Sequence, residues 1–325
     1  MRRRTLIAAL GTNAVISLTA GHGRAQNLPI VAVLSPQASE SAPVFGVFRA
    51  RLKELGQVEG RKIRLDFRFA AGQLDRIPIL AAELLASLPT VILADGAFIA
   101  QSLKDLTSLI PIVGILGPDP VASGLITSLG RPGANITGVT TLGRDLQVKR
   151  IELLKEAFPG LARLALLWDR SNDPGGLMID SILGHTARMG LRVEVLEGGR
   201  ADVLAASLAP DRLRDVDAIL VSQGPSHYSS RDQIVSLIAA SRKPAIYPER
   251  DYVAAGGLMS YGPRVADVFR RLAELTDRIL KGARPGDLAV EQVARVEYVI
   301  NLKTAKALEV SLSPIAINRA DEVID

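Results

Sequence analysis

The sequence contains no cysteine, and this absence excludes disulfide bonds, thiolate metal sites and cysteine nucleophiles. It also excludes a lipidated cysteine as a membrane anchor. Histidine occurs only three times, at His22, His185 and His227, and none has a neighbouring ligand at metal-binding spacing. No nucleophile elbow, P-loop or complete G-x-G-x-x-G fingerprint is present. The sequence therefore predicts a protein without a metal, a cofactor or a catalytic centre of these kinds.

The positive charge of the chain has a local source. The formal net charge is +5, but residues 1–25 carry four arginines and no acidic residue. The remaining residues hold 35 basic and 34 acidic side chains, so they are close to neutral. The basic surface expected of a nucleic-acid-binding protein is then missing, and we expect no nucleic-acid partner.

The N-terminus has the three parts of a cleavable secretory signal. A basic head, Arg2–Arg4, precedes an apolar stretch from Leu6 to Ala20 and small residues around Ala25. The apolar stretch is too short and too interrupted to favour a membrane span. We expect residues 1–25 to be a signal peptide and the mature chain to begin at Gln26. A membrane-anchored or disordered tail is the alternative. Export without a lipid anchor points to the periplasm of a Gram-negative bacterium.

One order of elements occurs twice along the chain. A strand-like alternation at 63–69, a helical run at 74–85 and a strand at 91–96 form the first pass. The second pass has a strand at 191–196, a helical run at 201–213 and a strand at 218–224. Each pass is a β-α-β unit whose last strand ends in a polar loop. Because ligands of such sheets bind outside the strand C-termini, two passes predict two lobes with a ligand site between them.

The rest of the chain also alternates between strands and helices, and its 325 residues exceed the usual size of one hydrophobic core. The predicted fold class is α/β, with two Rossmann-like parallel-sheet lobes joined by a hinge. The predicted lobes are residues 26–142 plus 255–284 and residues 143–254 plus 285–325. Crossings between them are expected near 140–145, 252–257 and 283–290. Further strands are expected at 30–34, 112–116, 136–139, 164–168, 244–247, 258–261 and 297–301, and further helices from Pro43 and at 145–158, 265–279 and 304–308.

Polar residues follow most of these strands and form the candidate ligand site. Helix N-termini favour an anion, and acidic loops suit an ammonium group, so the pattern fits an α-amino acid. For any single position, an N-cap or turn role is at least as good an interpretation. Asp119 before Pro120 is the sharpest case, because an N-cap explains it fully. The predicted ligand-binding residues are Ser35, Gln37, Asp95, Gly96, Asp119, Asp169, Ser171, Gln223, Ser226, Glu249 and Tyr261.

Two further residues have alternative interpretations. Trp168, the single tryptophan, ends the first strand of the second lobe, where it either closes the core or stacks on a ligand; the core is favoured. His227 follows the second pass and is interpreted as a solvated or ligand-touching loop residue rather than a catalyst.

Five segments in the same order resemble the ABC-transporter substrate-binding proteins related to tryptophan- and tyrosine-binding lipoproteins. They are FRARLKELGQVEGRKIRLDFR from Phe48, DPVASGLITSLGRPGANITGV from Asp119, KRIELLKEAFPGLARLALLWD from Lys149, VEYVINLKTAKAL from Val296 and the closing RADEVID. The resemblance covers roughly residues 28–325. It implies a type I periplasmic binding fold that closes on a small ligand and presents it to an ABC permease. The Gly/Thr-Pro-Ala turn that relatives often carry is replaced here by 95–98, a predicted cleft loop, so the resemblance does not fix tryptophan or tyrosine as the ligand.

The sequence thus predicts a periplasmic, monomeric, non-enzymatic solute-binding protein of an ABC importer, with an amino acid or a related compound as ligand. One alternative is a periplasmic sensor that passes ligand occupancy to a receptor. A second is an exported α/β enzyme acting through Asp95 and Glu249. A transcription factor of the same fold is disfavoured by the export signal and by the lack of an N-terminal helix-turn-helix.

Overall fold

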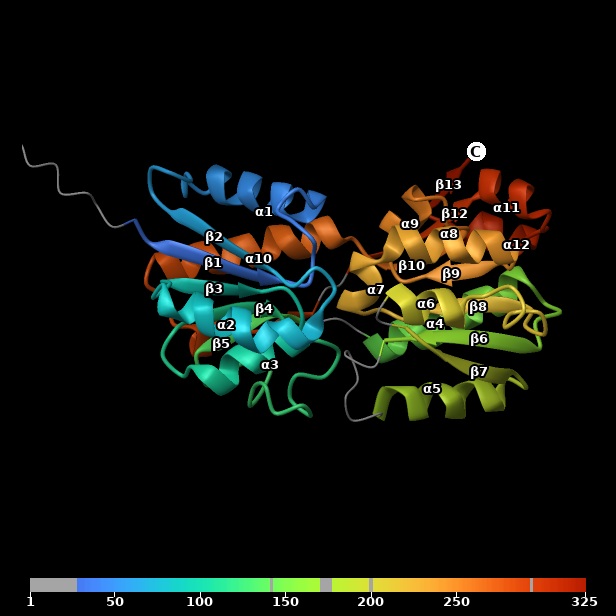
Figure 1. Cartoon of the computed structure of the whole chain (residues 1–325), viewed down its shortest axis with the longest axis horizontal. Coiled ribbons are helices and arrows are strands. Elements are labelled where there is room, and N and C mark those ends of the chain that lie inside the picture. Colours follow the sequence, from blue (N-terminus) through green and yellow to red (C-terminus); the bar gives the residue numbers. More distant parts are fainter. Residues whose placement is uncertain (1–27, 141–142, 170–176, 199–200, 293–294) are drawn as a thin grey trace, which may run out of the picture.

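The chain forms two α/β lobes that lie end to end (Figure 1). This computed structural model describes residues 28–140, 143–169, 177–198, 201–292 and 295–325. The predicted signal segment 1–25 lies outside the described residues. Each lobe is built around one sheet with helices on both faces, so the predicted fold class is confirmed.

The first sheet has the strand order β11-β5-β4-β3-β1-β2, and all of its paired strands run parallel. Its strands are β1 (Ile30–Ser35), β2 (Arg64–Phe69), β3 (Val91–Ala94), β4 (Ile112–Ile115), β5 (Ile136–Thr140) and β11 (Glu291–Gln292), and its helices are α1 (Pro43–Glu54), α2 (Ile77–Ala86), α3 (Ala97–Leu106) and α10 (Val265–Leu280).

Strand β1 lies between β2 and β3, and it is apolar from Ile30 to Leu34 because both of its faces are covered. Val31 and Val33 pack into one cluster with α1 and α10, whereas Ala32 and Leu34 pack into another with α2 and α3. Successive strand residues point to opposite faces, so one apolar run supplies both layers. The C-terminal ends of β1, β3 and β4 are thereby aligned at the edge that faces the other lobe (Figure 1).

The second sheet has the order β13-β12-β10-β9-β8-β6-β7. Its strands are β6 (Arg163–Trp168), β7 (Arg192–Glu197), β8 (Ala218–Val221), β9 (Ala245–Tyr247), β10 (Met259–Pro263), β12 (Val296–Asn301) and β13 (Glu322–Ile324), and its helices are α4 (Gly143–Ala157), α5 (Leu177–Arg188), α6 (Ala201–Ser207), α7 (Pro225–Ser229), α8 (Arg231–Ser241), α9 (Arg250–Ala254), α11 (Leu302–Leu308) and α12 (Pro314–Arg319). The prediction of purely parallel sheets fails at one point, because β12 runs antiparallel to β10.

The chain changes lobes at other positions than the sequence suggested. Residues 255–284 were expected as one piece of the first lobe, but β10 pairs with β9 and β12 in the second sheet. Residues 285–325 were expected in the second lobe, yet β11 pairs with β5 in the first sheet. Strand patterns do not reveal which sheet a strand joins, and β11 is too short to show a pattern. Below, lobe 1 denotes residues 28–140 and 264–292, and lobe 2 denotes residues 143–263 and 295–325.

The helical run expected at 201–213 is also shorter in the structure. Helix α6 ends at Ser207, although Leu208 and Leu213 continue the buried pattern. Pro210 accounts for the end, because proline disfavours helical conformation at the preceding residue and supplies no backbone N–H. The helical spacing of buried residues therefore continues beyond the last residue of the helix.

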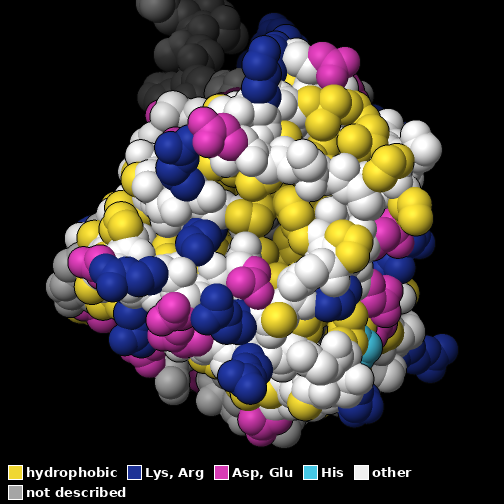
Figure 2. All heavy atoms as spheres, turned by 90° about the vertical axis from the view of Figure 1, so that its right-hand side faces the viewer, with side chains coloured by type: hydrophobic (Ala, Val, Ile, Leu, Met, Phe, Trp, Pro, Cys, Tyr) yellow, Lys and Arg dark blue, Asp and Glu magenta, His cyan; other side chains and the backbone are white. Residues whose placement is uncertain are grey.

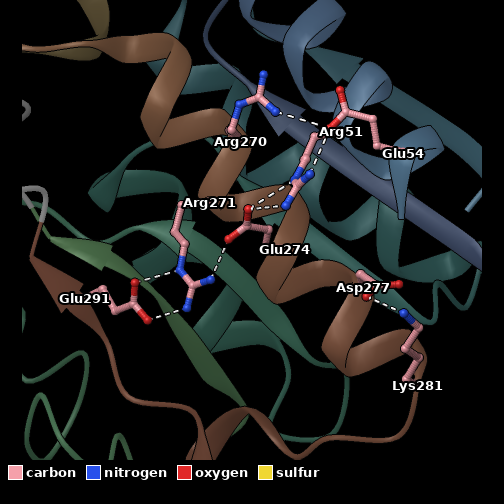
Figure 3. A network of polar contacts seen from close by, with 8 residues as sticks. All are labelled: Arg51, Glu54, Arg270, Arg271, Glu274, Asp277, Lys281 and Glu291. Atoms are coloured by element: carbon pink, nitrogen blue, oxygen red, sulfur yellow. Dashed lines mark hydrogen bonds and ion pairs between the residues drawn. The ribbon is translucent and has the colours of Figure 1, made fainter. Parts of the chain in front are cut away.

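The pairing of α1 with α10 is reinforced by a network of charged side chains (Figure 3). Glu274 on α10 accepts hydrogen bonds from Arg51 on α1, at 2.8 and 3.0 Å, and from Arg271, at 2.6 Å. Arg271 also pairs with Glu291 of β11. Each of these side chains is at least 25% exposed, so the network lies on the surface of lobe 1, outside the apolar contacts.

Removing the central acid of this network should have a small, salt-dependent effect. Glu274→Gln is expected to lower the free energy of unfolding by about 1 kcal/mol at low ionic strength, because partly exposed ion pairs contribute little. The loss should shrink in 1 M salt, where such pairs are screened. Urea unfolding at two salt concentrations checks this, and an equal loss at both would contradict it.

Candidate ligand-binding cleft

A cleft lies between the lobes, at the C-terminal edges of both sheets. It encloses about 710 Å³ of empty space, part of which is open to solvent. Its lining is mostly apolar with a few polar groups, which is typical of small-molecule sites. Lobe 1 lines it with Pro36, Gln37, Asp95, Gly96, Ala97, Ile115, Gly117, Val265, Val268 and Phe269, and lobe 2 with Gln223, Gly224, Tyr228, Glu249 and Pro263.

One wall of the cleft is apolar and rigid. Val265, Val268 and Phe269 come from the first turns of α10, which begins directly after the chain crosses from β10 into lobe 1. Ile115 at the end of β4 adds to the same lining. Val268 and Phe269 are also anchored in the lobe 1 core, so the wall is fixed by packing. Such a surface suits the hydrocarbon or aromatic part of a ligand.

Asp95 is the acidic group that lobe 1 contributes. It follows β3 and is 7% exposed, and the Ser35 hydroxyl donates to its Oδ2 at 2.6 Å. Burial raises the pKa of Asp95 to about 6, and the hydrogen bond from Ser35 opposes this rise. Gly96 then turns the chain into α3 with a φ of +132°, which favours glycine.

Glu249 is the acidic group that lobe 2 contributes. It lies between β9 and α9, is 4% exposed, and its Oε2 has no hydrogen-bond partner among the described residues. Burial raises the pKa of Glu249 to about 8; the positive charge of Arg150 and a hydrogen bond from Gln223 oppose this rise, and Asp251 adds to it. A buried carboxyl oxygen without a partner at a cleft is costly and is therefore a strong candidate for ligand contact.

The positive charge of Arg150 lowers the pKa of Glu249, and the sequence analysis did not select Arg150 as a site residue. It lies on α4, is fully buried, and donates to the carbonyl oxygens of Tyr261 at 2.6 Å and Pro248 at 3.2 Å. A third bond, of 2.9 Å, reaches Gln147 Oε1. Burial lowers the pKa of Arg150 to about 10, and the charge of Glu249 opposes this. The signal for this burial was present in the helix, because Gln147, Arg150, Ile151 and Leu154 share one helical face.

Five of the eleven predicted ligand residues line the cleft: Gln37, Asp95, Gly96, Gln223 and Glu249. Three more are buried outside that lining: Ser35, Asp169 and Ser226. Ser35 bonds to Asp95, and the Ser226 backbone N–H donates to Asp169 Oδ2 at 3.1 Å.

The other three predicted residues have different positions. Asp119 accepts a hydrogen bond from the Ala122 N–H at 2.9 Å and shapes a turn outside the cleft lining. Tyr261 packs edge-on against Tyr298, also outside the lining, and contributes its carbonyl oxygen to Arg150. Ser171 lies outside the described residues.

The interpretation of His227 as a solvated or ligand-touching residue is wrong. It lies in α7 with no exposed surface, and its Nδ1 lies 2.9 Å from the carbonyl oxygen of Ser222. Its Nε2 faces Gly198, where a Cβ would lie 1.8 Å from that nitrogen. Burial lowers the pKa of His227, so the ring is a neutral, structural part of lobe 2.

Trp168 belongs to the core, and the favoured interpretation of it as a core residue is confirmed. It is 3% exposed and packs with Leu166 and Ile182 in the core cluster of lobe 2. Its fluorescence emission maximum is therefore expected to stay unchanged on ligand addition and to shift to longer wavelength only on unfolding. A ligand-dependent shift in the folded protein, measured with tyrosine excitation avoided, would contradict this placement.

A second hollow lies at the far end of lobe 2 from the cleft. It is lined by the segments 157–161 and 310–313 together with Asp217 and Pro244. Figure 2 faces this end and shows hydrophobic side chains gathered in a shallow depression. The buried, convergent carboxyls described above lie in the interlobe cleft and not here, so the cleft is the candidate ligand site.

A family model described as ABC transporter substrate binding protein matches residues 28–324. The chain belongs to this family. It is 28% identical to the curated tyrosine-binding protein of Clostridioides difficile (strain R20291) over 264 residues, which are 81% of this chain and 75% of that protein.

Two solved structures share the fold of this substrate-binding protein. A conserved domain protein from Vibrio cholerae superposes with a TM-score of 0.82 at 22% identity, covering 91% of this chain and 99% of that one. An ABC domain in complex with L-tryptophan from Streptococcus pneumoniae gives 0.80 at 23% identity, covering 91% and 100%. More distant structural neighbours of this chain include a periplasmic binding protein/LacI transcriptional regulator from Alkaliphilus metalliredigens and a LacI family transcriptional regulator from Arthrobacter, in keeping with the type I periplasmic binding fold.

The family is one of transporter components and not of enzymes, which argues against the hydrolytic alternative. In the described part of the chain, no helix is long and apolar enough to cross a membrane. The same residues contain no cluster of His, Asp and Glu that could hold a metal ion.

Proposed function

We propose that this protein is the periplasmic receptor of an ABC importer for an amino acid with an aromatic or related apolar side chain. The observation that carries the proposal is the cleft itself, in which the unpartnered oxygen of Glu249 lies in the same lining as the apolar wall of Val268 and Phe269. The tyrosine-binding relative and the L-tryptophan complex of a structural neighbour support this class of ligand.

The cleft offers one surface for each part of such a ligand. The ammonium group pairs with Glu249, and the side chain lies against Ile115, Val268 and Phe269. None of the described lining residues is Lys, Arg or His. The described groups best suited to the carboxylate are the unpaired backbone amides at the start of α3, after Gly96.

Transport follows from a shift in the position of the lobes. A ligand that contacts both lobes at once binds the closed form more tightly and shifts the equilibrium toward it. In this proposal the 1–25 segment directs export and is removed, and the closed monomer then docks on an inner-membrane permease.

A ligand screen on the mature chain tests the proposal. Thermal unfolding is followed with L-tyrosine, L-tryptophan, L-phenylalanine, non-aromatic amino acids and the matching aromatic amines and acids. A ligand present at 100 times its Kd adds about 2.7 kcal/mol to the free energy of unfolding. Titration calorimetry then gives the affinity of each hit. If no member of the panel stabilises the protein and none alters its small-angle scattering, the proposed ligand class is wrong.

A further inference from the structure

Tyr228 occupies an unusual place between the lobes. It lies on α7, four residues after the cleft residue Gly224, and it is part of the cleft lining. The ring packs against the α8–α9 cluster of lobe 2, and also against the α1–α10 cluster of lobe 1. One half-buried side chain therefore contacts the hydrophobic cores of both lobes.

The lobe 2 contacts hold the Tyr228 ring in a fixed orientation. Its hydroxyl donates a hydrogen bond to Asp251 Oδ2, on the first turn of α9 and two residues after Glu249. The ring meets Tyr252 edge-on, with centroids 6.5 Å apart, and the guanidinium of Arg231 lies 5.2 Å from its centroid. Tyr228 thus links the helix that follows Gln223 to the helix that follows Glu249.

Lobe 1 also approaches α7 beside the tyrosine. The turn after β2 contains Gly72, with a φ of +76°, and a Cβ at that position would lie 3.6 Å from Ser229 Oγ. The neighbouring lobe 1 residues that line the cleft, Val268 and Phe269, belong to the same cluster that Tyr228 contacts. The contact of Tyr228 with lobe 1 is therefore apolar, whereas its hydroxyl bonds to lobe 2.

We propose that Tyr228 is the latch of the closed form: its ring holds lobe 1 against lobe 2, while its hydroxyl ties that contact to the α9 helix that carries Glu249 at its start. Opening of the lobes separates the ring from the lobe 1 cluster and exposes apolar surface on both. Because this contact is made by protein side chains alone, Tyr228 sets the balance between open and closed molecules before any ligand arrives.

The test measures the distance between the lobes without ligand, so it does not depend on the proposed ligand class. The natural chain has no cysteine, so Glu83→Cys on α2 and Arg188→Cys on α5 give one exposed label site in each lobe. Distance distributions between paired spin labels are compared for the mature parent protein, Tyr228→Ala and Tyr228→Phe. Tyr228→Ala is expected to lower the ratio of closed to open molecules by about tenfold, since a buried aromatic contact is lost. Tyr228→Phe keeps the ring and should keep most of the closed population.

Phe158→Ala is the matched control, because Phe158 is half-buried and packs only in lobe 2, at the end away from the cleft. It should leave the distance distribution unchanged. An unchanged distribution in Tyr228→Ala, or an equal opening in Phe158→Ala, overturns the proposal. If circular dichroism shows that Tyr228→Ala is unfolded, Tyr228→Leu keeps an apolar side chain but removes the ring, and the same criterion applies to it.

Discussion

Replacing Glu249 by glutamine is expected to weaken amino-acid binding by at least about 100-fold while leaving the fold intact. Glutamine has the same shape but no charge, so the ligand ammonium would lose its one fully buried anionic partner in lobe 2. Removing one member of a buried, hydrogen-bonded charge pair typically costs about 2–5 kcal/mol of binding free energy. Aromatic acids that lack the amine should bind the parent protein weakly and lose nothing further in Glu249→Gln.

The pH dependence gives the same prediction a second signature. The pKa of Glu249 is raised to about 8 in the free folded protein, against an ordinary 4.5 when it is exposed. The folded state therefore binds the proton more tightly than the unfolded state does. The free energy of unfolding falls as the pH rises from about 4.5 to about 8. Binding of an ammonium requires the carboxylate, so ligand affinity should rise as the pH rises toward 8 and a proton should be released on binding. Stability and affinity thus change in opposite directions with pH.

Calorimetry in buffers of different ionisation enthalpy measures the released proton directly. Glu249→Gln should abolish the release and should stabilise the free protein by about 1–3 kcal/mol at pH 9, the net of the relieved charge and a buried amide. Asp95→Asn is the matched comparison, because Ser35 already bonds to that carboxyl and its pKa is raised only to about 6. Proton release that persists in Glu249→Gln would assign the ammonium site elsewhere.

The residues of the cleft that the sequence could predict are those at strand ends. A polar loop after a buried strand is visible as a pattern, and parallel strands bring their C-terminal ends to one edge. Asp95, Gln223 and Glu249 were found in this way, and all three line the cleft. The same rule also selected Asp119 and Tyr261, because it cannot tell a turn residue or a core side chain from a residue that faces the ligand.

The other half of the cleft depends on where the chain crosses between lobes. Val265, Val268 and Phe269 lie in the helix that the sequence predicted at 265–279, which was not given a place in the ligand site. They reach the cleft because the crossing comes after Pro263, immediately before α10, instead of near residues 252–257. Tyr228 was missed for a similar reason, since its second contact is supplied by the other lobe. Such positions are set by how the lobes pack and leave no local pattern.

Removing the buried cation is expected to be the most destabilising single change. Arg150→Met should lower the free energy of unfolding by about 3–5 kcal/mol, because its hydrogen-bonded carbonyl oxygens at Tyr261 and Pro248 stay buried without their donors. Loss of the cation should also raise the pKa of Glu249 further, since Arg150 lowers it now. Urea unfolding and the pH profile of ligand binding measure the two effects. Lys149→Met, at the neighbouring surface position paired with Glu152, should cost less than about 1 kcal/mol.

Arg150→Lys separates the charge of this residue from its geometry. Arg150 joins three segments: helix α4 after the first crossing, the end of β10 before the second, and the Pro248 carbonyl next to Glu249. A lysine keeps a positive charge near Glu249 but presents one compact ammonium in place of a planar fork. The pH profile of ligand binding should therefore stay close to that of the parent, while the stability loss should remain at about half that of Arg150→Met or more. If lysine restores stability as well, the charge alone supports the cleft, and the bridge between the crossings is not needed to hold Glu249 in place.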